Sequence, residues 1–355
     1  MHWKGLKYIL VIVVLLGLCS WQSQRLAMLR RAGLPQAYSG YTADSSPLIT
    51  FVMAGLGGFR GIVSEVFWFR VNRLQEEWRY LELVQLADWL TMLDPHATEA
   101  WIYNAWNLAY NVSVMMIRDE DRLRWVRHGI VLLRDEALRF NPRDARLYRE
   151  LAWFYQNKIG DSLDSSHLAY KFDLVSSLAP CVKADGTVVV NDDTRAALAK
   201  MRLEVERMVA LEARFGPLDW RVATTHALYW AMQGLDCATG YEQYMCRRAV
   251  YQALISSVFN GRFVGNLAQS KWQTAGNTAL VLTTADFIEE TYRLFPAQNM
   301  HAIYVRYLCA AIYRLHAEVH ADVIDALYQR LLSALPPEVE KPGLQQVMDG
   351  WGVGT

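Results

Sequence analysis

The sequence predicts an all-α fold, an irregular solenoid of stacked antiparallel helix hairpins that follows one N-terminal transmembrane helix. Three observations support this prediction. A sequence motif that begins with Asp-Pro or Asn-Pro, which we call the repeated phrase, occurs twice, as DPHATEAWIYNAW at 94–106 and NPRDARLYRELAW at 141–153. Helix-forming stretches end at prolines through most of the chain, and an uncharged apolar run occupies residues 8–21.

The apolar run predicts a membrane anchor over residues 1–22. Lysines precede the run and an arginine follows it. A helix of that length reaches only about 21 Å, short of the roughly 30 Å hydrocarbon core, so lysines that extend toward the headgroups would complete a span through residues 3–22. A cleaved signal peptide is the alternative, but small residues do not follow Leu18 at the required pair of positions, and we favour the uncleaved anchor.

The side of the membrane is less strongly specified. Basic residues lie on both sides of the anchor, so the positive-inside count is nearly tied. Because uncleaved signals usually leave the N-terminus in the cytoplasm, we expect a single-pass protein of the bacterial inner membrane whose body is periplasmic.

Residues 23–60 predict a linker and a glycine-rich apolar segment. The apolar stretch from Leu48 to Arg70 is interrupted by four glycines and by the charged Arg60 and Glu65, which favours a buried or membrane-grazing helix over a second transmembrane helix. Its GLGGFRG motif at 55–61 has neither the third glycine of a dinucleotide site nor the Gly-Lys-Ser/Thr of a phosphate loop. The motif therefore indicates close packing or a hinge.

Residues 61–335 predict a helical repeat domain, and 336–355 a C-terminal tail. Proline disfavours helical geometry in the residue before it and lacks the amide that would continue a helix. The predicted helices end at Pro95, Pro142, Pro180, Pro217, Pro296 and Pro336. New helices start after three of these prolines, each with an alanine ten residues on, at Ala105, Ala152 and Ala227.

The repeated phrase is typical of a shape rather than of a chemistry. An aromatic residue lies six residues after the proline in both copies, as Trp101 and Tyr148. We expect the alanine to let two helices approach closely and the aromatic residue to fill the layer between hairpins. One hairpin cannot bury both its faces, so helix, proline turn and helix in repetition predict stacked hairpins.

Composition and motifs argue against several functional classes. Lysine and arginine together number 36, as do aspartate and glutamate, so no basic stripe favours nucleic acid. HAEVH at 316–320 has histidines at a helical spacing, but no zincin order or third ligand accompanies them, and we expect no metal, no cofactor and no catalytic residues. Cys237 and Cys246 bracket a turn-like segment, where both a disulfide and two unpaired thiols fit the sequence.

The phrase resembles the tetratricopeptide repeat (TPR) family. Its first-helix positions are matched by Trp101, Ala105 and Leu108 and again by Tyr148, Ala152 and Tyr155, while Ala137 and Pro142 match the second helix. The prolines lie 47 residues apart rather than 34, and we expect the extra length in the loop MMIRDEDRL at 115–123. Residues 55–160 are also similar to a group of uncharacterised bacterial membrane-anchored proteins.

The TPR resemblance implies a concave groove that binds a partner protein or peptide. Mapped by the motif, the groove residues are Trp106, Tyr110, Arg146, Arg149, Trp153, Gln156 and Asn157. The resemblance thus implies a scaffold that acts through the hairpins between about Trp101 and Ala231. A structural subunit of a larger membrane complex is the alternative, and an enzyme with an unrecognised site is the least favoured.

Overall fold

The computed structural model describes residues 60–266, 271–296 and 299–353, together with Gly17, Trp21, Gln22 and Arg25. Apart from those four positions, the anchor predicted over 1–22 and the linker that follows it up to Arg60 lie outside the described residues. No helix within the described ranges is long and apolar enough to cross a membrane. Most of these residues are helical and one two-stranded sheet accompanies them, so the all-α prediction is confirmed.

The N-terminal half of the described chain consists of three helix pairs. The first is α3 (Arg60–Glu76) with α4 (Tyr80–Leu93). The second pair consists of two continuous helical rods. The first rod is made of α5 (Thr98–Trp106), the π-helical segment η2 (Asn107–Val112) and α6 (Ser113–Met115). The other rod is made of α7 (Asp119–Val131), the π-helical segment η3 (Leu132–Ala137) and α8 (Leu138–Phe140). The third is α9 (Ala145–Trp153) with the π-helical segment η4 (Phe154–Ile159), followed by α10 (His167–Leu178).

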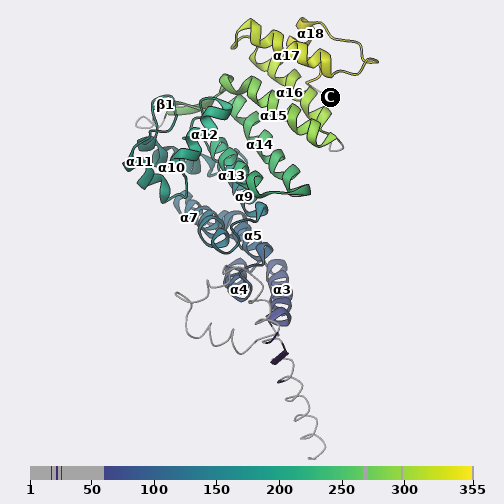
Figure 1. Ribbon diagram of the computed structural model, residues 1–355. Helices are drawn as coiled ribbons and strands as arrows, with labels where there is room; N and C mark the ends of the chain where they lie inside the picture. Colours follow the sequence, from purple (N-terminus) through teal and green to yellow (C-terminus); the bar gives the residue numbers. More distant parts are fainter. Residues whose placement is uncertain are drawn as a thin grey trace, which may run out of the picture.

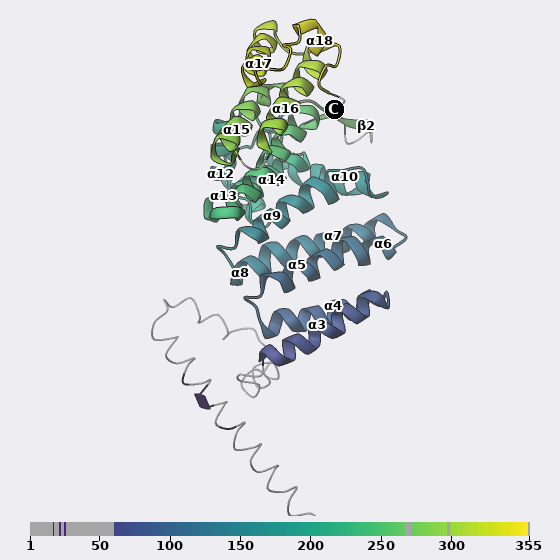
Figure 2. The same cartoon turned by 90° about the vertical axis from the view of Figure 1, so that its right-hand side faces the viewer.

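The C-terminal half continues the stack with a small sheet inserted into it. Its elements are η5 (Ala179–Cys181), α11 (Asp192–Ala199), α12 (Val205–Phe215), α13 (Ala223–Cys237), α14 (Gly240–Asn260), β1 (Arg262–Asn266), β2 (Lys271–Ala275), η7 (Thr278–Leu280), α15 (Val281–Leu294), α16 (Met300–Leu315), α17 (Ala321–Ala334) and α18 (Leu344–Met348). The strands are antiparallel, with Arg262 opposite Ala275. Figures 1 and 2 show the helix pairs stacked in chain order, from α3 and α4 at one end to α17 and α18 at the other.

The predicted proline stops are confirmed. Six helices end two residues before a proline, namely α4, α8, α10, α12, α15 and α17. At five of these ends the residue before the proline leaves helical geometry, as the steric clash with the proline ring requires, whereas Ala179 before Pro180 stays helical and begins η5. Prolines therefore mark the ends of these six helices.

The aromatic residue of the repeated phrase has a polar role as well as a packing role. The Trp101 Nε1–H donates to the carbonyl oxygen of Pro95 at 2.9 Å, and the Tyr148 hydroxyl donates to the carbonyl oxygen of Pro142, also at 2.9 Å. Both rings also stack, Trp101 on Phe140 and Tyr148 on Trp230. Each copy thus fastens its proline turn onto the first turns of the following helix.

The predicted close approach of helices occurs at the alanine of the first copy. A Cβ placed on Gly129 of α7 would lie 2.8 Å from the carbonyl oxygen of Ala105 and 3.3 Å from the Cβ of Ala109. A separation below 3.0 Å is not tolerated, so α5 and α7 pack this closely only because both helices carry small residues there.

The extra length beyond a 34-residue period does not lie in a loop, so that prediction is wrong. Only three residues, 116–118, separate α6 from α7. The added residues instead lengthen the two rods, which contain η2 and η3. The sequence pattern did not reveal the π-helical segments, because apolar periodicity barely changes over a single wide turn.

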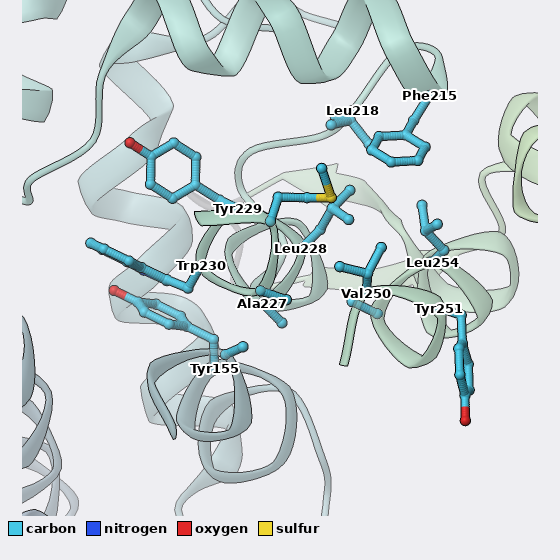
Figure 3. Close-up of a cluster of buried hydrophobic side chains, with 14 of the residues drawn as sticks. Tyr155, Phe215, Leu218, Ala227, Leu228, Tyr229, Trp230, Val250, Tyr251 and Leu254 are labelled. Carbon is cyan, nitrogen blue, oxygen red and sulfur yellow. The ribbon is translucent and has the colours of Figure 1, made fainter. Parts of the chain in front are cut away.

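The core is divided unevenly along the stack. A large cluster extends from Trp101 to Val347, and a small separate cluster under the first helix pair contains Val71, Leu74, Leu83, Leu90 and Ala100. The centre of the large cluster is α13, which packs against both α9 and α14. Figure 3 shows Tyr155, Tyr229 and Trp230 on one side of α13 and Val250 and Leu254 of α14 on the other.

The third copy of the ten-residue spacing between proline and alanine, from Pro217 to Ala227, has different surroundings from the first two. Ala227 lies in α13 at the expected position, but the next residue is Leu228 rather than tryptophan and is fully buried. Every residue from Ala223 to Met232 is buried. The groove predicted to extend to Ala231 therefore does not continue along α13.

The predicted C-terminal tail is part of the folded domain. Residues 344–348 form α18, which packs on α16, and Val347 is fully buried in the large cluster. The sheet at 262–275 was not predicted either. Its two strands are short and lie between helices, so their pattern has too few residues to distinguish it from a loop.

Candidate partner-binding surface

Three of the predicted groove residues form one aromatic pile. Trp106 ends α5 and Trp153 ends α9, and their ring centroids are 6.3 Å apart with planes 28° from parallel. Tyr110 stacks on Trp106 at 4.3 Å and 18°. Trp153 is 43% exposed, whereas Trp106 and Tyr110 are half-buried. The pile therefore presents its outer ring to solvent and is supported from behind.

Two further aromatic residues, which the sequence analysis did not identify, extend the pile toward the first helix pair. Tyr103 lies one helical turn before Trp106 and makes an edge contact with Trp68 of α3 at 5.4 Å. Its hydroxyl donates to Gln75 Oε1 at 2.6 Å. We call Trp68, Tyr103, Trp106, Tyr110 and Trp153 the aromatic band. The spacing of 103, 106 and 110 on one helix face was the available signal.

The aromatic band is held rigidly by the residues beneath it. Trp106 Nε1–H donates to Glu150 Oε2 at 2.9 Å, and Phe154 contacts both Trp106 and Tyr110. The buried Lys158 ammonium lies 4.8 Å from the centre of the Tyr110 ring, an attractive cation–π arrangement. Burial raises the pKa of Tyr110, so its hydroxyl stays neutral over the physiological range.

Lys158 is itself tied into a buried ion pair. Its Nζ lies 2.5 Å from Asp164 Oδ2, and Arg122 also approaches Asp164, at 3.4 Å. Burial lowers the pKa of Lys158, while the hydrogen bond from the Lys158 ammonium holds the pKa of Asp164 below its usual range against the opposing effect of burial. The pair fixes the turn after η4 against the start of α7, which stiffens one end of the aromatic band.

The predicted polar groove residues have partners within the fold. Arg149 forms an ion pair with Glu242 of α14, and Gln156 Nε2 donates to Ser256 Oγ of the same helix at 3.0 Å. Arg146 pairs with Asp144 and Glu99 at the ends of two neighbouring helices. These side chains therefore join consecutive layers of the stack, while the aromatic residues remain available to a partner.

Asn157, the last predicted groove residue, has two roles. Its Nδ2 donates to the carbonyl oxygen of Trp153 at 3.3 Å, and Asn107 donates in the same way to Tyr103 in the first copy, at 3.0 Å. Both carbonyls lie in the last turn before a π-helical segment, so the same amide-to-carbonyl bond recurs in the two copies. Asn157 also lines, with Gln156, a pocket of about 390 Å³ that includes Lys171, Arg221 and Phe263.

Two other features of the sequence lie outside the aromatic band. Cys237 and Cys246 are free thiols, so the disulfide alternative is not formed; the Cys237 thiol faces carbonyl oxygens of its own helix and the Cys246 thiol points toward Ala145 of α9. His316 and His320 do not share a helical face, because α16 ends at Leu315 and α17 begins at Ala321. Within the described ranges, no group of three or more metal-ligating side chains comes together.

Comparison of the chain with known protein families, with curated proteins and with solved structures finds no match. The aromatic band therefore has to be interpreted from its own geometry. A partly exposed row of aromatic rings, in which Tyr103 and Trp106 already have hydrogen-bond partners, is suited to covering apolar side chains of another molecule.

Proposed function

We propose that this chain is a membrane-anchored scaffold of the bacterial cell envelope, with a TPR-like solenoid that binds a partner protein through the aromatic band. The observation that supports this most directly is Trp153, an exposed tryptophan stacked on a second tryptophan that is fixed from behind. The body would lie on the periplasmic side, attached through residues 3–22.

The arrangement has the physical properties of a binding hot spot. Tryptophan and tyrosine bring large contact areas at a low cost in conformational entropy, and rings already locked by Glu150, Phe154 and Lys158 lose little more on binding. Because the arginines of the surface are paired internally, we expect the partner to contribute apolar side chains, as a helix or an extended segment would.

The test is the single substitution Trp153→Ala in the full-length protein, purified from native membranes with its partners. A hot-spot tryptophan contributes about 2 kcal/mol or more, so we expect roughly 30-fold weaker partner capture. Phe172→Ala in α10 is the matched control, because Phe172 has the same exposed fraction, 43%, but lies outside the aromatic band. Equal recovery of every partner by both variants would overturn the proposal.

The alternative, a structural subunit of a larger complex, is favoured by one observation. The first helix pair exposes large apolar side chains, among them Phe69 at 74% and Trp89 at 61%, as a permanently covered surface would. Size-exclusion chromatography in mild detergent separates the two functions. A monomer that gains its partner reversibly supports the scaffold, and an assembly that never releases this chain supports the subunit.

A further inference from the structure

The outer face of α3 is apolar although nothing in the described chain covers it. Ile62, Val66 and Phe69 are 61%, 58% and 74% exposed. Their spacing of four and three residues places them in one stripe along the helix. The opposite side of α3 is already used, since Val71 and Leu74 are buried in the small cluster against α4. The helix therefore carries a second apolar stripe opposite its buried side, with the charged Glu65 and Arg73 exposed beside it.

The residues around this stripe have the character of a membrane interface. Trp89 of α4 is 61% exposed, and its ring lies 6.2 Å from that of Phe67, on the side of α3 that packs against α4. Arg70 and Arg73 border the far end of the stripe, and both are exposed. Aromatic rings and arginines with long aliphatic stems are the side chains that suit the boundary between acyl chains and headgroups.

The position of α3 in the chain indicates what covers the stripe. The twelve residues that precede it, 48–59, contain no charged side chain, and a second charge-free run occupies 8–21. In Figures 1 and 2, α3 and α4 form one end of the stack, so the chain enters the fold at its apolar end. Fewer than forty residues separate the charge-free run at 8–21 from Arg60.

We propose that the stripe Ile62–Val66–Phe69 lies in the surface of the phospholipid bilayer, so that α3 runs along the membrane and the stack projects from it. This inference rests on the anchor of the proposed function. It adds a second, independent membrane contact that fixes the orientation of the aromatic band relative to the bilayer.

Charge has a minor role in this contact. The α3 sequence contains three arginines and two glutamates, so its net charge is only +1. Since each basic residue near an anionic surface contributes about 1 kcal/mol, electrostatic attraction is small beside the burial of three large apolar side chains. The contact is therefore expected to persist in high salt and in membranes without anionic lipid.

The test uses the full-length protein in liposomes of phosphatidylethanolamine and phosphatidylglycerol. A small fluorophore is attached at Val66→Cys in a background with Cys19→Ser and Cys237→Ser, and quenching by lipids with a nitroxide near the headgroup is measured. Asp325→Cys on the exposed side of α17 is the matched control. We expect severalfold stronger quenching at position 66 than at 325, unchanged in high salt. Ile62→Cys repeats the measurement if the first variant fails to fold.

The other occupants of the stripe give different results. A protein that resists carbonate extraction but shows equal quenching at both positions overturns this inference and leaves the scaffold proposal intact. A crosslink between two copies through position 66, without quenching, assigns the stripe to self-association and also overturns it. Release of the wild-type chain by carbonate contradicts the anchor itself, and therefore the proposed function.

Discussion

The two ends of the stack are built differently. At the C-terminal end, α16 and α18 belong to the large core, and the outward residues of α17 are polar, namely Asp322, Asp325, Gln329 and Ser333. At the N-terminal end, α3 and α4 have their own small cluster and expose Ile62, Val66 and Phe69. A stack of hairpins needs a polar outer face on its terminal layer to remain soluble.

Among the described residues, only the C-terminal end of the stack is closed by the chain itself. The C-terminal layer is a cap, whereas the N-terminal layer has an apolar stripe that no described residue covers. Because the small cluster shares few side chains with the large one, the first helix pair should also open more easily than the rest of the chain.

The largest expected effect tests whether the first helix pair unfolds independently of the large core. Trp230→Ala removes a fully buried ring from the centre of the large core and should cost about 3–5 kcal/mol in global unfolding. Leu83→Ala removes a buried side chain from the small cluster, and its loss should appear as local opening. Urea denaturation and hydrogen exchange by mass spectrometry measure the two effects.

Faster exchange confined to α3 and α4 is the result expected for Leu83→Ala. If that variant lowers the global unfolding midpoint as much as Trp230→Ala does, the two clusters form one cooperative unit and the comparison fails.

Acid should weaken the large core specifically. His226 is fully buried between Trp220, whose carbonyl lies 2.8 Å from its Nε2, and the stacked ring of Tyr155. Burial lowers the pKa of His226 from 6.5 to about 4. The unfolded chain therefore binds this proton more readily, and the stability that depends on neutral His226 is present above pH 6.5 and lost as pH falls toward 4. The loss amounts to about 3 kcal/mol.

The measurement is the free energy of unfolding between pH 7 and 4 for the wild type and for His226→Gln, which does not titrate. The wild type should show the steeper decline, with early exchange in α13 rather than in α3. Parallel curves for the two proteins would contradict the assignment of acid sensitivity to this histidine.

The smallest expected effect concerns two strained turns, one in the first helix pair and one in the region of the large core. Trp78, between α3 and α4, and Arg202, before α12, both adopt positive φ, 59° and 55°, which favours glycine. Each substitution to glycine should stabilise its own region by about 1 kcal/mol or less. Trp78→Gly should slow exchange in α3 and α4 only, and Arg202→Gly should raise the global midpoint. The same shift in both would indicate coupling between the regions.

Much of the fold was readable from local chemistry. Prolines mark six helix ends, each two residues before the proline, and at five of them a steric effect takes the neighbouring residue out of helical geometry. The π-helical segments and the burial of α13 were not readable, since both depend on contacts between distant residues. Leu228, in place of a tryptophan, was the local indication that the third copy differs.

The candidate surface was predicted in part. The offsets of Trp106, Tyr110 and Trp153 placed them together, because both copies of the phrase share one register. The polar residues were harder, since the motif gives the direction of a side chain but not its partner. Arg149 and Gln156 bond to Glu242 and Ser256 of α14, which lies within their reach.

The two copies of the phrase also widen into π-helix at the same place, directly after Trp106 and Trp153. An α-helix rotates by about 100° per residue, so a wider turn changes the direction in which all the following side chains of that rod point. Two neighbouring rods that widen into π-helix at corresponding positions keep the same side chains facing each other. A one-residue deletion in η2 alone would turn the end of that rod away from its neighbour, whereas paired deletions in η2 and η4 would preserve their match.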